Sequence, residues 1–184
     1  MNLKSLIQLP FLMLTLLVGQ EESPFTRFDV YIYPEYDHPG VGVFIEGALK
    51  ADQYPRYTEI NVPAATTMAL LRKGEQTQEA ERIELKERDG KKYLPLDLSE
   101  SRFQVQFYFD PFDDASPHRK FSYELATNEQ LPEWHLVLQQ PLGAEGFIHS
   151  LSEPEVINEN FGLKFFRMHK QGLKPGEAYT LNVS

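Results

Sequence analysis

The chain has 184 residues, with 27 acidic against 18 basic side chains and a formal net charge of −9. This acidic balance argues against a nucleic-acid-binding surface and against adhesion to an anionic membrane, because both require clustered lysine and arginine. Hydrophobic residues make up 41% of the chain and cysteine is absent, so packing must stabilise the fold, and thiolate zinc sites and cysteine nucleophiles are excluded.

Residues 1–19 resemble an export signal. Lys4 provides a positive start, an apolar stretch follows, and Gly19 is small enough to precede a cleavage site. A spanning helix needs about 20 apolar residues, and this stretch is shorter and contains Pro10. Cleavage is therefore favoured over an uncleaved N-terminal membrane anchor or a buried helix. We expect an exported protein, periplasmic or extracellular, whose contact with the membrane depends on whether this segment is retained.

From residue 25 onward apolar side chains recur at every second position, which is typical of strands with one buried face. The first two strands place their apolar residues on one face: Phe28, Val30, Ile32, Val41, Val43 and Ile45. A helix over residues 66–81 is disfavoured because Gly74 interrupts it, so residues 67–71 are predicted as a short strand.

A β-hairpin is predicted around Asp89-Gly90, with strands at residues 81–88 and Lys91–Leu98. The pair Asp-Gly supplies the two positive φ angles that a type I′ turn needs.

The clearest alternation lies in Arg102–Phe109, and similar patterns follow to the end of the sequence. The predicted inward residues are Phe103, Val105, Phe107, Phe109, Phe121, Tyr123, Leu125, Trp134, Leu136, Leu138, Phe161, Leu163, Phe165, Tyr179, Leu181 and Val183. About ten strands with a polar face each are typical of an antiparallel, immunoglobulin-like β-sandwich. We therefore predict an all-β fold with one domain over residues 25–184.

No catalytic signature is present in the sequence. There is no G-x-S-x-G motif around a serine. No two of the five histidines have the sequence spacing of metal ligands: His38, His118, His135, His149 and His169. We expect them to face solvent or to cap turns, and we expect a protein without catalytic residues or cofactor.

An acidic loop offers a possible calcium site at Asp110, Asp113 and Asp114, because hard carboxylate oxygens suit Ca²⁺. The spacing is not that of a D-x-D-x-D-G loop, and Asp, Ser and Pro are also the ordinary residues of turns. A plain turn is therefore the stronger interpretation.

Tyrosines near the first turns are the best candidates for a binding surface: Tyr31, Tyr33, Tyr36, Tyr54 and Tyr57. Strand alternation turns Tyr31 and Tyr33 away from the Phe28 face. Exposed aromatic rings stack on sugars or anchor protein interfaces. The alternative is that both faces of this strand are covered, as in a central strand.

Residues 28–47, 139–147 and 161–183 are similar to segments of exported bacterial β-sandwich proteins of the immunoglobulin-like or carboxypeptidase-regulatory-like kind, which have no assigned activity. The similarity rests on turns and strand edges, so it identifies no site residues. It implies a place in the cell envelope and a non-enzymatic role. Two hypotheses follow: an accessory or structural subunit that docks on an envelope protein, and a carbohydrate-binding module that uses the tyrosines.

Overall fold

The computed structural model describes residues 22–74, 79–112, 118–159 and 162–184, apart from the side chain of residue 132. These ranges consist of strands and connecting segments without an α-helix, which confirms the all-β prediction. The predicted signal or anchor segment, residues 1–19, lies outside them. Within the described ranges, no helix has the length and apolar character needed to cross a bilayer.

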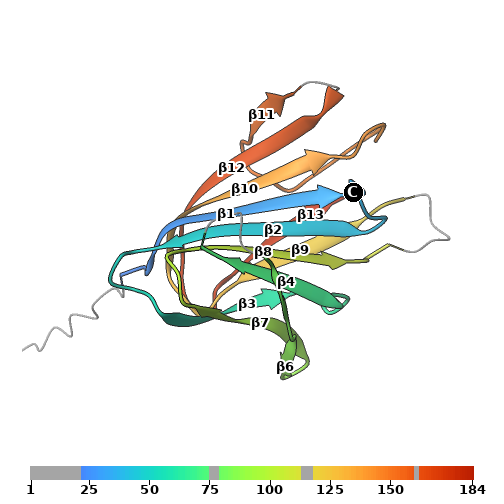
Figure 1. Ribbon diagram of the computed structural model, residues 1–184. Coiled ribbons are helices and arrows are strands. Elements are labelled where there is room, and N and C mark those ends of the chain that lie inside the picture. Colours follow the sequence, from blue (N-terminus) through green and yellow to red (C-terminus); the bar gives the residue numbers. More distant parts are fainter. Residues whose placement is uncertain (1–21, 75–78, 113–117, 160–161) are drawn as a thin grey trace, which may run out of the picture.

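The main element is an eight-stranded sheet, the large sheet, with the strand order β11-β12-β10-β1-β2-β8-β4-β5 (Figure 1). Its strands are β1 (Phe25–Pro34), β2 (Val41–Leu49), β4 (Met68–Lys73), β5 (Glu81–Ile83), β8 (Arg102–Phe109), β10 (Leu131–Gln140), β11 (Glu155–Asn158) and β12 (Lys164–Leu173). Neighbouring strands are antiparallel except β1 and β10, which run parallel. The expected purely antiparallel arrangement is wrong at this pair, because no hairpin joins β1 to β10 and the intervening chain can return in either direction.

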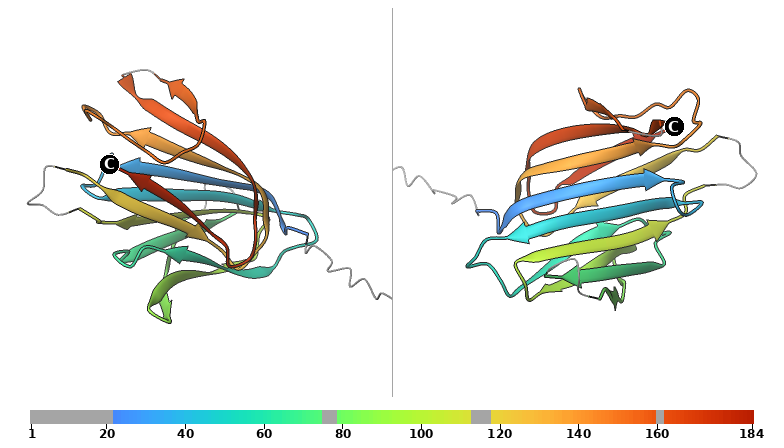
Figure 2. Two further views of the ribbon diagram at one scale, coloured as in Figure 1. Left: turned by 180° about the vertical axis from the view of Figure 1, so that it is seen from behind. Right: turned by 45° about the horizontal axis from the view of Figure 1, so that its top comes forward.

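Two smaller sheets complete the fold. One has the order β3-β7-β6, and the other pairs β13 with β9. Their strands are β3 (Arg56–Val62), β6 (Lys86–Arg88), β7 (Lys91–Leu98), β9 (Phe121–Ala126) and β13 (Ala178–Val183). Seen from behind, β9 and β13 lie in front of the large sheet (Figure 2). Buried side chains of all three sheets belong to one hydrophobic cluster.

Most of the predicted alternation is confirmed. Phe103, Val105, Phe107 and Phe109 are at most 3% exposed. The Asp89-Gly90 hairpin is also confirmed, with φ angles of 53° and 74° and strands β6 and β7 on either side. The predicted strand at residues 81–88 is divided, because β5 pairs with β4 in the large sheet whereas β6 pairs with β7.

The orientation predicted for the segment of β12 is wrong. Phe161 lies outside the described residues, and Leu163 and Phe165 are only partly buried. The buried side chains are Phe166 and Met168, at 8% and 3% exposure. Pairing with β10 sets this register, since Phe166 and Met168 lie opposite the buried residues Leu138 and Leu136. Two adjacent phenylalanines leave the inward position undetermined in the sequence, and only the partner strand decides it.

Candidate functional site

The outer face of the large sheet, on the side away from the core, carries the candidate site. The registers of β1, β10 and β12 align two rows of outward residues, Asp29-His135-His169 and Tyr31-Val137-Arg167. A third set consists of the pair Gln139-Phe165 and of Tyr33, the next outward residue of β1, which line the same hollow. Side chains directly opposite one another on adjacent strands are within contact distance. The first row is polar, whereas the other two combine aromatic, aliphatic and polar groups.

The aromatic rows border a hollow of about 510 Å³, here called the tyrosine hollow. Its aromatic lining consists of Tyr31, Tyr33, Tyr36, Phe44 and Phe165. Glu46, Gln104 and Gln139 supply carboxylate and amide groups to the same hollow. The hollow therefore offers both ring surface and hydrogen-bonding groups to a ligand.

Tyr33 is the centre of the aromatic group. Its ring lies 6.4 Å from that of Tyr31 in a parallel arrangement, 5.8 Å from Tyr36, and 5.4 Å edge-on from Phe44. Burial, followed by the nearby Tyr31 and Glu46, raises the pKa of Tyr33 to about 12. Burial also raises the pKa of Tyr31. Both hydroxyls therefore stay protonated at neutral pH and can donate hydrogen bonds.

The five predicted tyrosines do not form one surface. Tyr31, Tyr33 and Tyr36 meet at the tyrosine hollow, and Tyr36 is 62% exposed. Tyr54 and Tyr57 are 38% and 50% exposed, but they belong to another sheet: Tyr54 lies just before the strand β3, and Tyr57 is its second residue. The hydroxyl of Tyr57 donates a hydrogen bond to Glu59 at 2.9 Å, and this bond raises the pKa of Tyr57.

Asp110, the first residue of the predicted calcium site, is exposed, and its Oδ1 accepts a hydrogen bond from the backbone N–H of Phe112 at 3.1 Å. This bond is typical of a turn residue. Asp113 and Asp114 lie outside the described residues. Calcium binding at this loop stays a prediction.

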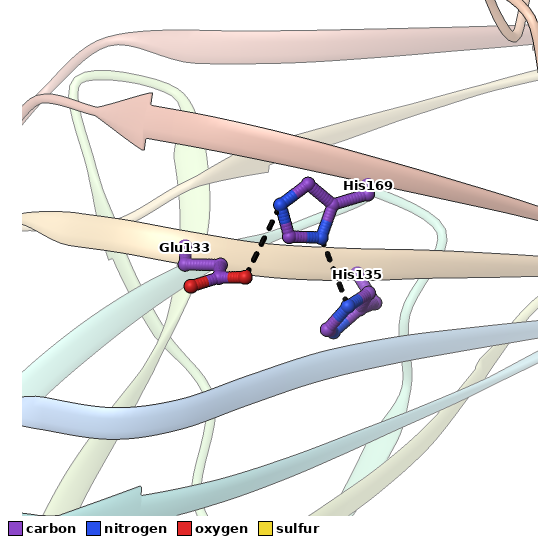
Figure 3. Close-up of side chains that lie close together, drawn as sticks. All are labelled: Glu133, His135 and His169. Carbon is purple, nitrogen blue, oxygen red and sulfur yellow. Dashed lines mark hydrogen bonds and ion pairs between the residues drawn. The ribbon is translucent and has the colours of Figure 1, made fainter.

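A second cluster on the outer face, the histidine cluster, consists of Glu133, His135 and His169 (Figure 3). His135 Nε2 lies 3.0 Å from His169 Nδ1, and His169 Nε2 lies 3.2 Å from Glu133 Oε1. His135 Nδ1 lies 2.8 Å from Asp29 Oδ1. The side chains of His135, His169 and Glu133 are 40%, 44% and 59% exposed.

Sequence reasoning missed the histidine cluster. The expected solvent-facing placement of His135 and His169 is confirmed, but they also meet each other, because β12 places His169 directly opposite His135. Glu133 and His135 are two residues apart on one strand, so they share a face. That spacing was the one hint of a cluster in the sequence. The third member, His169, comes from a strand about 30 residues away, and the sequence does not reveal how that strand pairs with β10.

Asp29 links the histidine cluster to the neighbouring strand. It is only 7% exposed and forms an ion pair with Arg27 in addition to its contact with His135. Arg27 also contacts Glu46 of β2 at 2.9 Å. The hydrogen bond to Asp29 is the main cause that raises the pKa of Arg27. Asp29 is therefore a hydrogen-bond acceptor held in a fixed position beside His135.

The remaining histidines fit the expectation in part. His38 Nδ1 accepts a hydrogen bond from the backbone N–H of Gly40, which is a turn-capping role, and His118 is exposed. His149 neither faces solvent freely nor caps a turn: its ring centre lies 4.2 Å from that of Phe166, and burial lowers its pKa. The expectation is wrong for His149 because the edge of the core covers its Nδ1.

The fold and site thus define an all-β protein with a mixed large sheet whose outer face carries an aromatic hollow and a histidine cluster. Comparisons with the models of known protein families and with curated proteins find no match to this chain.

Proposed function

We propose that the protein is a non-catalytic accessory or structural subunit of a bacterial cell-envelope assembly and docks on another envelope protein through the outer face of its large sheet. The observation that carries this proposal is the group of partly exposed aromatic side chains at the tyrosine hollow. Residues on a solvated sheet face are normally polar. Tyrosines that remain partly accessible on such a face are typical anchors of protein interfaces.

The width of the apolar surface favours a protein over a small ligand. The row that contains Tyr33 continues through Gly42 and Tyr108 to Met68 of β4, which is 40% exposed. Toward the other edge of the sheet, Phe165 of β12 pairs with Ile157 of β11. Aromatic and apolar side chains distributed over several strands of an outer face are usually covered by a partner.

We also propose that the chain folds as an immunoglobulin-like β-sandwich, in which the large sheet is one layer and the two smaller sheets are the other. The shared hydrophobic cluster supports this description, as does the bridge between Ile60 and Thr127 that links the smaller sheets. An exported location, which the predicted signal segment favours, is part of the same proposal.

Carbohydrate binding is the second candidate function, and the composition of the tyrosine hollow favours it. Aromatic rings contact the apolar faces of sugars, and the carboxylate of Glu46 and the amide of Gln104 can bond sugar hydroxyls. This hypothesis needs only the hollow, whereas protein docking uses the wider face.

Tyr36→Ala separates the two functions from a structural role. Tyr36 is the most exposed ring of the hollow. Tyr33 packs against three other rings, so removal of the Tyr33 ring would also lower stability. Tyr57→Ala is the matched control, because Tyr57 is 50% exposed on another sheet. Association is measured by crosslinking and co-purification from native envelope fractions, sugar binding on a glycan array, and stability by thermal unfolding.

Protein docking predicts that Tyr36→Ala weakens association by about 2 kcal/mol, with little change in melting temperature, while Tyr57→Ala binds as the unmodified protein does. Glycan-array binding that only Tyr36→Ala removes would establish the carbohydrate function instead. Equal behaviour of both variants in both binding assays would refute the proposal.

A further inference from the structure

Each ring of the histidine cluster turns one nitrogen toward a carboxylate and the other nitrogen toward the second ring. His135 Nδ1 lies 2.8 Å from Asp29 Oδ1, and His169 Nε2 lies 3.2 Å from Glu133 Oε1. An imidazole that donates one N–H to a carboxylate can offer a lone pair on its other nitrogen. In this tautomer the facing nitrogens, His135 Nε2 and His169 Nδ1, lie 3.0 Å apart and aim their lone pairs at the same small space. Such a space suits an electron-pair acceptor.

We propose that this acceptor is a divalent transition-metal ion, Zn²⁺ in the first instance, bound by His135 Nε2 and His169 Nδ1. Both outer N–H groups then keep their carboxylate partners, and the two inner lone pairs converge on the metal. Two imidazoles with a nearby carboxylate are a donor set that suits zinc. The inference goes beyond the proposed function and does not depend on it.

The distances agree with this assignment. Zinc–nitrogen bonds of about 2.0–2.1 Å at a tetrahedral angle separate two nitrogens by about 3.3 Å. The pair is 3.0 Å apart, so a small opening admits the ion. The ligand atoms offered by Glu133, His135 and His169 lie within 4.8 Å of one another, so the Glu133 carboxylate is close enough to balance part of the charge of the ion while it accepts the hydrogen bond from His169 Nε2.

The surroundings fix the rings in the orientation that a metal needs. A ligating histidine normally donates its second ring N–H to a carboxylate or carbonyl group, which sets the tautomer. Asp29 is the carboxylate partner of His135 Nδ1, and it is buried and held by Arg27. Glu133 is the carboxylate partner of His169 Nε2. Because β10 and β12 are adjacent antiparallel strands, the sheet itself fixes the distance between the two rings.

The site is accessible to an ion from solvent and leaves coordination positions open. The side chains of His135 and His169 are 40% and 44% exposed. With two protein ligands, a tetrahedral ion keeps two positions for water or for donor atoms of a bound molecule. These positions face the same side of the sheet as the tyrosine hollow.

Isothermal titration of the full chain with ZnCl₂ alone tests the proposal, and titration with CoCl₂ reports coordination geometry through visible absorption. We expect one saturable site with the intense visible bands of tetrahedral Co²⁺. His169→Ala and His135→Ala should weaken zinc binding by about 100-fold. His118→Ala is the control, since this exposed histidine lies outside the cluster, and it should bind zinc as the unmodified chain does. Asp29→Asn, which changes a positioning residue, should weaken binding by about 10-fold and shift the cobalt bands.

Histidine-ring NMR spectra of the unmodified chain keep the test decisive if a variant fails to fold. Zinc should then shift the ring signals of His135 and His169 and leave those of His118 in place. Absence of saturable zinc binding would overturn the inference, and so would equal affinity in all three alanine variants. Because Tyr36→Ala leaves the metal ligands intact, it should bind zinc normally, so the two proposals fail independently.

Discussion

Gly47 of β2 packs against the ring of Phe103 on β8, and this contact predicts that Gly47→Ala destabilises the protein. The two residues are directly paired across the sheet, and a methyl group at position 47 would occupy the space of the Phe103 ring. That ring cannot move away easily, because it is 3% exposed and lies 6.1 Å from Phe25 and 6.5 Å from Phe28.

Overpacking of a filled core costs about 1–3 kcal/mol, and we expect the upper end because the overlap is with an aromatic ring enclosed by two others. For a chain of this size that corresponds to a fall in melting temperature of about 6–12 °C. Urea unfolding of Gly47→Ala measures the free energy directly. Gly42→Ala is the matched control on the same strand, because its methyl would meet the outward, partly exposed Tyr108 ring at 3.1 Å.

A double variant identifies the cause. Phe103→Leu removes ring atoms that the new methyl would contact, so Gly47→Ala combined with Phe103→Leu should be less destabilised than the sum of the two single changes. If Gly47→Ala alone unfolds within about 0.5 kcal/mol of the unmodified chain, the close packing of Phe103 on β2 is not what the structure indicates.

Four further predictions follow from the described residues and from the sequence. Phe107→Ala, at a fully buried position, should cost about 3–5 kcal/mol in urea unfolding. Gly90→Val should cost about 1 kcal/mol or more, because φ is 74° and nothing lies within 4 Å of an added Cβ, so backbone strain alone acts. Burial lowers the pKa of His149 from 6.5, so its contribution to stability is present above pH 6.5 and is lost as the pH falls through the folded-state value; His149→Phe should flatten that part of the stability–pH curve. Intact-mass measurement of exported protein should give a chain that begins near Gln20, and a full-length mass in the membrane fraction would establish an anchor.

The inward residues were predictable because burial imposes a period of two on each strand. Phe28, Val30 and Ile32 follow this period and are buried. The Asp89-Gly90 turn was predictable for another reason, because its conformation depends on two adjacent residues. Local rules suffice for such features. They did not suffice for β12, where Phe165 and Phe166 are equally apolar and the pairing with β10 decides which one is buried.

The candidate site was only half predictable for the same reason. The outward orientation of Tyr31 and Tyr33 is a property of one strand, so the alternation within β1 reveals it. The histidine cluster depends on the parallel pairing of β1 with β10 and on the antiparallel pairing of β10 with β12. Two registers had to be known before His135 could be placed between Asp29 and His169, and a single sequence contains neither.

Folding explains the inner face of the large sheet better than it explains the outer one. The inward residues of β1 are buried in the core, and their apolar character follows directly from that burial. The row Asp29-His135-His169 agrees with the rule that a solvated face is polar, whereas Tyr31 and Tyr33 depart from it. Threonine would satisfy the β-propensity of these positions without exposing a ring. The ring of Tyr33 also contributes packing against Tyr31, Tyr36 and Phe44, but such packing among partly exposed rings on an outer face is not needed to form the strand. A group of tyrosines here therefore points to use of the surface, which is the reason to look for the partner there first.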